Sequence, residues 1–237
     1  KLDTIYFTEN RVSNSIRKLK TSLSSGPDGL PSIFFKKLNS ALAGPLHILF
    51  KLIFEAKEFP NIWKHAYVIP IFKKGASSSV QNYRPISLTC VISKLLESII
   101  KIDLVDFLNS NKIINGAQHG FVSKRSTCTN LLECINDWTL SINSGYHSRT
   151  IYIDFKKAFD SVCHSKLLFK LSKIGIIGPL HSMFSSYLSN RTQQVVIGNN
   201  LSNSRQIISG IPQGSVLGPV FFILYINDLI DIFQIKP

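Results

Sequence analysis

The sequence predicts an α+β fold in which a sheet carries the functional site. Three observations predict it. Runs with strand character alternate with longer runs of helical spacing. Hydrophobic residues make up 44% of the 237 residues, so the chain can bury a core. Lys and Arg outnumber Asp and Glu by 27 to 14, a formal charge of +13 that favours a polyanionic partner. Charge alone does not choose between RNA, DNA and anionic lipid.

The first half of the chain is predicted to be mostly helical. The spacing of its apolar residues predicts a helix over residues 8–21, and the turn at residues 25–29 follows because glycine and proline together favour a turn. Residues 67–72 are typical of a short strand, which a Lys-Lys-Gly loop ends. Further helices are predicted over residues 31–38, 44–57, 92–108 and 127–142.

The second half contains more strand character. Strands are predicted over residues 150–155, 192–197 and 205–209. A turn at residues 198–200 would join the last two as a pair. Helices are predicted over residues 164–174, 179–188 and 216–233. The stretch near Gly145 is polar, so we expect one lobe over residues 1–145 and a second over residues 146–237.

Several classes of protein are disfavoured. The four cysteines form no CxxC pair, so we expect neither a zinc site nor a disulfide framework. We expect the protein to reside in a reducing compartment. Residues 1–10 lack the apolar core of a signal peptide. The longest apolar run, residues 216–226, contains Gly218 and Pro219 and is too short to span a bilayer. We therefore expect an intracellular protein, nuclear or cytoplasmic, that is neither secreted nor bound to a membrane.

Residues 151–160 are the first segment that could carry chemistry. Their β pattern delivers Asp154 to the end of a strand, before a turn into a helix. A carboxylate there can bind Mg²⁺, and an adjacent backbone carbonyl can add a ligand. The bulky Phe159 follows, where it could bound a sugar pocket. The alternative is structural: Asp154 only ends the strand, and Asp160 caps the following helix.

Residues 209–219 are rich in glycine and proline. Gly210 and Gly214 would let the backbone approach a nucleotide closely, and Gln213 could donate a hydrogen bond to a base or sugar. A helix that begins near Ser215 would offer free N–H groups to an anion. The alternative is a connector in which Ser215 caps that helix, and for the segment alone this interpretation is favoured.

A third segment combines basic residues with a strand. Lys73 and Lys74 lie on a loop, and Arg84 precedes a proline. These side chains could hold a triphosphate from one side. Arg84 is the better candidate because its planar guanidinium makes bidentate contacts with phosphate. Solvated surface charge is the alternative, and it is favoured for an isolated pair of lysines.

Together, these segments resemble the finger motifs, motif A and motif B of reverse transcriptases, in that order. The resemblance is carried by WKHAYVIPIFKKG, NYRPISLTCVISKLLESII, QHGFVSKRST, IDFKKAFDSVCHSKLLFKL and SGIPQGSVLGPVFFILYINDL, which look most like non-LTR retrotransposons of the jockey or CR1 kind. SGPDGLP resembles a turn at the N-terminal edge of that domain. The match runs from residue 5 to residue 233, nearly the whole chain.

The resemblance implies a fold and an activity. The fold would be a right-hand polymerase with fingers and an N-terminal extension over residues 1–145. Residues 146–237 would form a partial palm with an antiparallel sheet flanked by helices, without a thumb. The activity would be that of an RNA-directed DNA polymerase, a nucleotidyltransferase that adds dNTPs to the 3′-hydroxyl of a DNA primer on an RNA template. Its cofactor would be Mg²⁺ or Mn²⁺, and its oligomeric state stays open.

The resemblance also implies roles for single residues. Asp154 would hold both catalytic metals, with the backbone carbonyl of Phe155 as an additional ligand. The bulk of Phe159 would disfavour a ribose 2′-hydroxyl. The residues implied to bind the nucleotide are Lys73, Lys74, Arg84, Phe159, Gln213 and Gly214. Which of the two lysines contacts the triphosphate stays open. The residues implied more weakly to touch template RNA are Arg125, Asp28 and Gly29.

The sequence departs from the family pattern in one respect. Motif C, a Phe/Tyr-Ala-Asp-Asp hairpin expected about a dozen residues after YINDL, is not present, and no Asp-Asp pair occurs. Two catalytic metals need shared carboxylates. We therefore expect these 237 residues to be unable to polymerise by themselves. We also expect apolar surface around Phe221, Phe222 and Tyr225 to be exposed, with self-association as the result.

Two other interpretations remain. One is a non-catalytic nucleic-acid-binding relic of a retroelement, which would keep the basic fingers and lack the chemistry. The other is a group II intron maturase, which shares the architecture. The second is disfavoured because YRPISL together with IPQGSVLGP looks closer to the retrotransposon branch.

Overall fold

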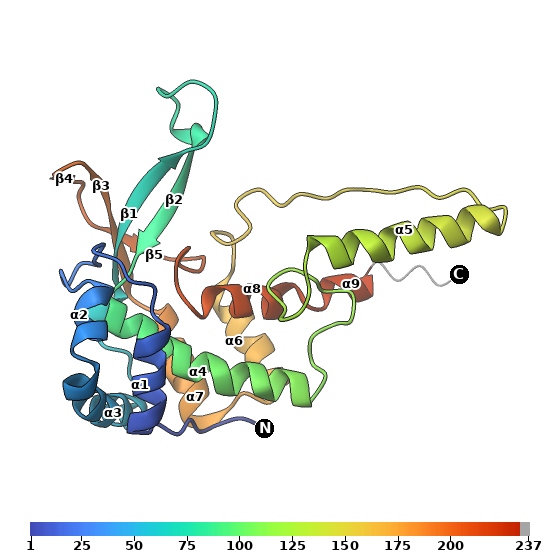
Figure 1. The fold of residues 1–237 in the computed structure, drawn as a ribbon. Coiled ribbons are helices and arrows are strands. Elements are labelled where there is room, and N and C mark those ends of the chain that lie inside the picture. The colour runs from blue at the N-terminus through green and yellow to red at the C-terminus, as the bar shows by residue number, and fades with distance from the viewer. Residues whose placement is uncertain (233–237) are drawn as a thin grey trace.

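The computed structural model describes the backbone of residues 1–232 and the side chains of residues 1–230 (Figure 1). In chain order the helices are α1 (Glu9–Lys18), α2 (Ser32–Lys37), α3 (Asn39–Ala56), α4 (Val91–Ser110), α5 (Thr127–Asn143), α6 (His164–Lys173), α7 (Gly178–Leu188), α8 (Gly218–Ile226) and α9 (Leu229–Ile232). The strands are β1 (His65–Phe72), β2 (Tyr83–Leu88), β3 (Arg191–Ile197), β4 (Asn200–Leu201) and β5 (Arg205–Ile207), and two short 3₁₀ helices are η1 (Asn61–Lys64) and η2 (Val80–Asn82). The helix predicted over residues 216–233 is interrupted between α8 and α9, and its last residue lies outside the described residues.

One sheet joins the two halves of the chain. Its strand order is β2-β1-β3-β4. Strand β5 pairs with residues 191–193 of β3, and β4 pairs with residues 196–197. Strands β1 and β2 form an antiparallel hairpin that projects from the body (Figure 1). The antiparallel pairing predicted for residues 146–237 is present where β3 pairs with β4 and β5. Strand β3 also pairs with β1 in parallel, with His65 opposite Thr192, so the sheet as a whole is mixed. Parallel pairing is possible because a long helical connection separates the two strands.

The strand predicted over residues 150–155 was also wrong. These residues lie outside every strand and helix, and the side chains of Ile151, Tyr152 and Ile153 are exposed. A strand needs a neighbour to accept and donate its backbone hydrogen bonds. No strand among residues 1–232 pairs with this segment, so the alternating pattern by itself does not produce one.

The core lies between α1, α3, α4, α7 and α8. Helix α1 begins where the Thr8 hydroxyl accepts the Arg11 N–H over 3.3 Å, and it buries Val12 and Ile16 completely. Aromatic rings fill the centre, where Phe59 meets Tyr187 edge to face with ring centroids 5.0 Å apart. This core contains residues from both predicted lobes, and the division at residue 145 stays a prediction.

The apolar surface expected at α8 is mostly covered. Phe221 is fully buried, with its ring 4.9 Å from that of Phe184, and Phe222 and Tyr225 are half-buried. The expectation of exposure was therefore wrong at Phe221. Exposed apolar side chains occur at several places in the described residues, and one group of them lies on α5 and on the segment that follows it, at Leu131, Leu132, Ile135, Leu140, Ile142, Tyr146, Ile151, Tyr152, Ile153 and Phe155.

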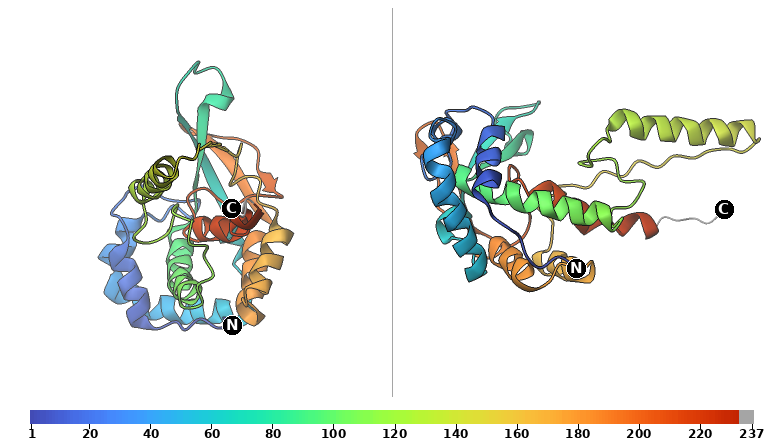
Figure 2. Two further views of the ribbon diagram at one scale, coloured as in Figure 1. Left: turned by 90° about the vertical axis from the view of Figure 1, so that its right-hand side faces the viewer. Right: turned by 60° about the horizontal axis from the view of Figure 1, so that its bottom comes forward.

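Helix α5 projects from the helical body together with residues 144–158, and we call this unit the arm (Figures 1 and 2). A capping box begins the helix, because the Ser126 hydroxyl accepts the Thr129 N–H and the Thr129 hydroxyl accepts the Ser126 N–H. None of its residues is buried. Within residues 1–232, every helix is too short or too polar to cross a bilayer.

Candidate nucleotide and nucleic-acid site

The Gly/Pro-rich residues 209–219, called the glycine turn below, pack against the end of β2. The Ser87 N–H donates to the Gln213 carbonyl oxygen over 2.8 Å. Gly214 has a φ of +123°, and a Cβ there would lie 2.4 Å from the Ser87 carbonyl oxygen, so only glycine fits. Gly214 therefore approaches β2 closely, whereas the approach to a nucleotide that the sequence suggests stays a prediction.

The other side of the glycine turn contacts the segment before α6. A Cβ on Gly210 would lie 2.8 Å from the Asp160 Cα, and the His164 ring is 2.7 Å from the Gly210 carbonyl oxygen. The Gln213 amide donates to the Asp160 carboxylate over 3.3 Å. The carboxylate beside Gln213 is therefore Asp160. It does not cap α6, whose N-cap residue is Cys163.

Asp154 lies in the unpaired stretch of the arm, after α5, and is exposed to solvent. The pocket that contains Gln213 and Asp160 is not lined by Asp154 within the described part of the chain. The side chain of Phe155, half exposed, faces a different pocket beside Phe222 and Tyr225. The geometry thus does not bring Asp154 to the glycine turn.

Phe159 stands in an aromatic stack. Its ring lies 4.5 Å from that of Phe222 with an interplanar angle of 18°, and the ring of Phe121 meets it edge-on at 6.0 Å. The Phe159 carbonyl oxygen accepts the Ile211 N–H over 3.0 Å, which ties the stack to the glycine turn. Phe159 therefore contacts two aromatic rings, and its backbone is tied to the glycine turn by a hydrogen bond.

The basic residues of the β1–β2 hairpin are exposed. Lys73 and Lys74 follow β1 at the tip, and Arg84 lies on β2 opposite Ile71. The tip is ordered by Asn82, whose carbonyl oxygen accepts the Lys73 N–H over 2.8 Å. These three side chains make no ion pair with another described residue. Their charges are therefore available to an anion.

A cleft of about 750 Å³ lies between α1, the loop after it and α4. Its cationic lining residues are Lys18, Lys20, Lys94 and Lys101, so we call it the lysine cleft. The described residues that line it include no Asp or Glu. Gly214 and Val216 of the glycine turn and Leu88 of β2 complete its wall, so the cleft adjoins the turn directly.

The interior of the lysine cleft is suited to an anion. Six serines line it with the lysines, and the Thr89 hydroxyl, 1% exposed, has no hydrogen-bond partner among the described residues. Burial lowers the pKa of Lys94, which a bound anion would counteract. Sequence reasoning missed these lysines, although Lys94 and Lys101 recur two helical turns apart on α4.

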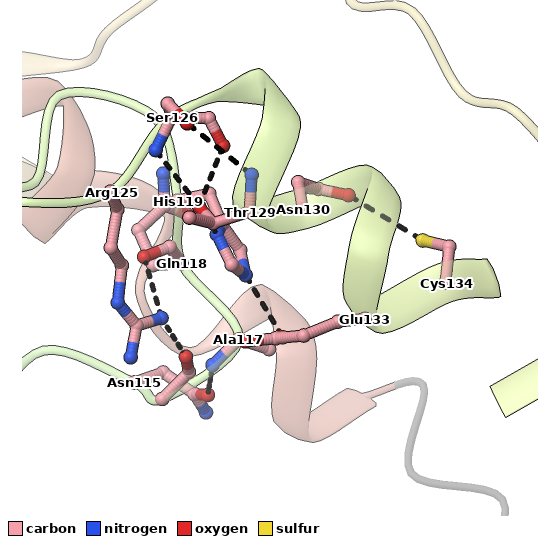
Figure 3. Close-up of polar contacts among 11 residues, drawn as sticks. Asn115, Ala117, Gln118, His119, Arg125, Ser126, Thr129, Asn130, Glu133 and Cys134 are labelled. Carbon is pink, nitrogen blue, oxygen red and sulfur yellow. Dashed lines mark hydrogen bonds and ion pairs between the residues drawn. The ribbon is translucent and has the colours of Figure 1, made fainter. Parts of the chain in front are cut away.

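The residues predicted to touch template RNA have structural partners. The Arg125 guanidinium donates to the carbonyl oxygens of Gly116 and Gln118, which holds its own loop (Figure 3). The Asp28 carboxylate accepts the Leu30 N–H over 3.3 Å. Gly26 of that turn lines the lysine cleft, whereas Asp28 and Gly29 do not.

Figure 3 also shows how the arm is attached. The His119 ring lies 2.9 Å from the Thr129 hydroxyl and 2.9 Å from the Glu133 carboxylate. His119 itself is buried, whereas Glu133 is mostly exposed. A side chain from the loop before α5 thus holds the first two turns of that helix.

A metal site is not assembled by the described residues. No group of three or more His, Cys, Asp or Glu side chains within residues 1–230 is placed to hold a metal ion. Asp154 and the Phe155 carbonyl would supply oxygen ligands, which Mg²⁺ prefers. A carboxylate shared between two metals needs further acidic ligands beside it. The described residues therefore do not fit a complete metal pair.

Comparison with known proteins indicates a family for the chain, which the geometry alone does not. A family described as reverse transcriptase (RNA-dependent DNA polymerase) matches residues 71–236. The probable RNA-directed DNA polymerase from transposon BS of Drosophila melanogaster is 31% identical over 219 residues, which cover 92% of this chain and 24% of that protein. The RNA-directed DNA polymerase from mobile element jockey of the same species is 30% identical over 223 residues, which cover 94% and 24%.

A third relative is the probable RNA-directed DNA polymerase from transposon X-element of Drosophila melanogaster. It is 28% identical over 224 residues, which cover 94% of this chain and 25% of that protein. The chain thus spans about a quarter of the length of these curated relatives.

Proposed function

Since the chain belongs to the reverse transcriptase (RNA-dependent DNA polymerase) family, we propose that it forms the template-binding and nucleotide-binding part of an enzyme that copies RNA into DNA. The reaction transfers a nucleotide from a dNTP to a primer 3′-hydroxyl. The observation that carries the proposal is the lysine cleft, because its cationic wall adjoins the glycine turn. Template and nucleotide would meet at that junction.

The lysine cleft would hold the template backbone. Phosphates bound by Lys94 and Lys101 would release counterions, and this release supplies affinity without sequence preference. The serine hydroxyls and the unpartnered Thr89 hydroxyl would donate hydrogen bonds to phosphate oxygens or to ribose hydroxyls. The positions of these groups support a single-stranded template that passes over Gly26 and Gly214.

The nucleotide would lie between the hairpin and the glycine turn. Arg84 and either Lys73 or Lys74 would contact the triphosphate, and Gln213 would leave Asp160 to contact the base or sugar. Phe159, in contact with two aromatic rings, would exclude the ribose 2′-hydroxyl. The unpaired cations of the hairpin and the rigid ring support these roles.

Divalent metal chemistry is general in reverse transcriptases, and Mg²⁺ or Mn²⁺ would supply activation of the primer hydroxyl and neutralisation of the leaving pyrophosphate. Asp154 and the Phe155 carbonyl would be ligands from this chain. The described residues do not complete the ligand set of these metals.

RNA binding in a salt series tests the proposal. The wild-type chain should bind single-stranded RNA with an affinity that falls as salt rises. Lys94→Gln and Lys101→Gln should each reduce the slope of log affinity against log salt by about 1. Lys51→Gln, on the outer face of α3, is the matched control and should leave the slope unchanged. Equal effects of cleft and control variants would remove the cleft from the proposal.

Residues 1–237 by themselves should not extend a primer. The reason is that Asp154 is exposed and that the described residues include no group of three or more His, Cys, Asp or Glu side chains placed to hold a metal ion. The measurement is incorporation of labelled dNTP on an RNA template, with Asp154→Asn as the control. Steady incorporation that the substitution abolishes would contradict this expectation. RNA binding without incorporation would support the binding role of this part of the chain.

A further inference from the structure

Glu97, on α4, is a carboxylate buried in the core. Its side chain is 1% exposed, and it makes no ion pair within residues 1–230. Burial of an unpaired carboxylate is costly unless hydrogen bonds stabilise its charge. The position of Glu97 therefore requires an account of what its two oxygens accept.

Four donors surround the carboxylate. On one oxygen, the Ser93 hydroxyl donates over 2.9 Å. On the other, the Val216 N–H donates over 2.8 Å, the Leu217 N–H over 3.1 Å and the Tyr187 hydroxyl over 3.3 Å. The two N–H groups belong to residues more than a hundred positions later in the chain, at the end of the glycine turn.

The location of these N–H groups explains how the negative charge of the buried Glu97 carboxylate is stabilised. They immediately precede α8, whose first turn leaves backbone N–H groups without partners inside the helix. The helix dipole favours a negative charge at that end. The N-cap residue of α8 is Leu217, and the Ser215 hydroxyl accepts the Gly218 N–H over 3.1 Å. Glu97 thus places a negative charge at the N-terminal end of α8 from another part of the core.

Helix α4 carries Glu97 and also forms part of the wall of the lysine cleft. Lys94 and Lys101 on α4 line the cleft, and so do Gly214 and Val216 of the glycine turn. Glu97 lies between the two lysines along α4 and points to the turn instead. The carboxylate therefore links α4 to the part of the glycine turn that adjoins the cleft.

We propose that Glu97 is a positioning residue, which holds the glycine turn against α4 through the Val216 and Leu217 N–H groups so that Gln213 and Gly214 meet the incoming nucleotide. The proposal rests on the proposed function for its consequence, but the anchor itself is a property of the folded chain. Loss of the carboxylate frees the turn and leaves the lysines in place. Nucleotide binding should suffer more than RNA binding.

The test uses Glu97→Gln, which keeps the shape and removes the charge, with Ser93→Ala as the matched control. Ser93→Ala removes one donor to the same carboxylate and leaves both turn contacts. The first measurement is amide hydrogen exchange at Val216 and Leu217. The second is the affinity of the 237-residue chain for RNA and for a matched dNTP in the presence of an RNA template and a dideoxy-terminated DNA primer.

In Glu97→Gln, exchange at the two amides should rise at least about tenfold, as expected when hydrogen bonds to a charged acceptor are weakened. Affinity for the dNTP should fall by about the same factor, and RNA affinity should stay within about twofold. Ser93→Ala should resemble wild type in all three. If Glu97→Gln does not fold, Glu97→Asp, which withdraws the carboxylate by one methylene, should give intermediate values.

Unchanged exchange in the folded variant would overturn the anchor. Faster exchange with unchanged dNTP affinity would overturn the positioning role. If wild type binds neither RNA nor dNTP, the proposed function fails instead, and the exchange result still decides whether Glu97 anchors the turn.

Discussion

The helical body and the arm bury very different fractions of similar apolar side chains. In the body, Phe50 and Leu96 are fully buried between helices. In the arm, Leu132 is 66% exposed and Ile151 is 85% exposed. Helix α5 nevertheless forms, because a capping box and the contacts of His119 begin it. Local signals are thus enough to define a helix, whereas burial depends on a partner surface.

Core truncation should show the largest difference between the two regions. Phe50→Ala should lower the free energy of unfolding by about 3–5 kcal/mol, because it removes a fully buried ring that packs on Trp63. Leu132→Ala, on the arm, should change it by less than about 0.5 kcal/mol. Urea denaturation measures both. A cost at Leu132 as large as at Phe50 would mean that the arm is packed in solution.

The exposed apolar face of the arm should cause self-association. Replacing Leu132 and Ile135 by lysine should weaken the association constant at least about tenfold, because about 1.4 kcal/mol corresponds to that factor and two large side chains are removed. Asn136→Lys with Asn143→Lys adds the same charge to α5 without loss of an apolar group. Sedimentation over a concentration series measures the effect. A wild-type chain that stays monomeric at tens of micromolar would contradict this prediction.

The attachment of the arm should have an intermediate effect. His119→Ala removes a buried ring and its contacts with Thr129 and Glu133, at a cost of about 1–2 kcal/mol. Exchange of the first α5 amides should accelerate, while that of the α4 amides should not. Cys134→Ala, which loses one contact on the exposed side of the same helix, is the control. Equal changes in α4 and α5 would show that the arm unfolds only with the body.

The smallest expected effect is a pH dependence in the body. Burial lowers the pKa of Lys94 below its ordinary value of 10.5, so the unfolded chain binds more protons than the folded chain just below that pH. Lys94 therefore contributes stability that rises as the pH approaches 10.5. Burial raises the pKa of Cys90 to about 11, which acts in the opposite direction.

The contribution of Lys94 is therefore measured as the difference in free energy of unfolding between Lys94→Gln and wild type over a pH series. Lys94→Gln should be more stable than wild type near neutral pH, and that advantage should shrink as the pH approaches 10.5. The RNA affinity of the wild-type chain should fall as the pH rises towards 10.5, because deprotonated Lys94 is neutral and no longer binds phosphate. A pH-independent difference would mean that Lys94 is solvated in the folded chain.

Much of the fold follows from local patterns in the sequence. The helices of the body and strands β1 and β3 lie within a few residues of their predicted positions. Strand β2 was not predicted, because Pro85 interrupts its pattern and its pairing with β1 is what defines it. The strand expected over residues 150–155 shows the converse case, in which the pattern is present and the partner strand is not.

The candidate site was harder to predict than the fold. Gly214 was predicted to let the backbone approach a nucleotide, and this stays a prediction, whereas its close approach to the Ser87 carbonyl oxygen of β2 was not foreseen. The pairing of Gln213 with Asp160, and the approach of Glu97 to the turn, join residues that are 53 and about 120 positions apart. No local pattern encodes such contacts. The family relationship, by contrast, was predicted from the motifs and is confirmed.

The parallel pairing of β1 with β3 has a consequence for synthesis on the ribosome. His65 contacts the Thr192 hydroxyl across 127 positions of chain. At translation rates of about 5–20 residues per second, His65 at the start of β1 would wait roughly 6–25 s for its partner Thr192 in β3 to be added. During that interval one edge of β1 offers unpaired N–H and C=O groups to any other strand. A nascent chain should thus depend on chaperones until its second half is made.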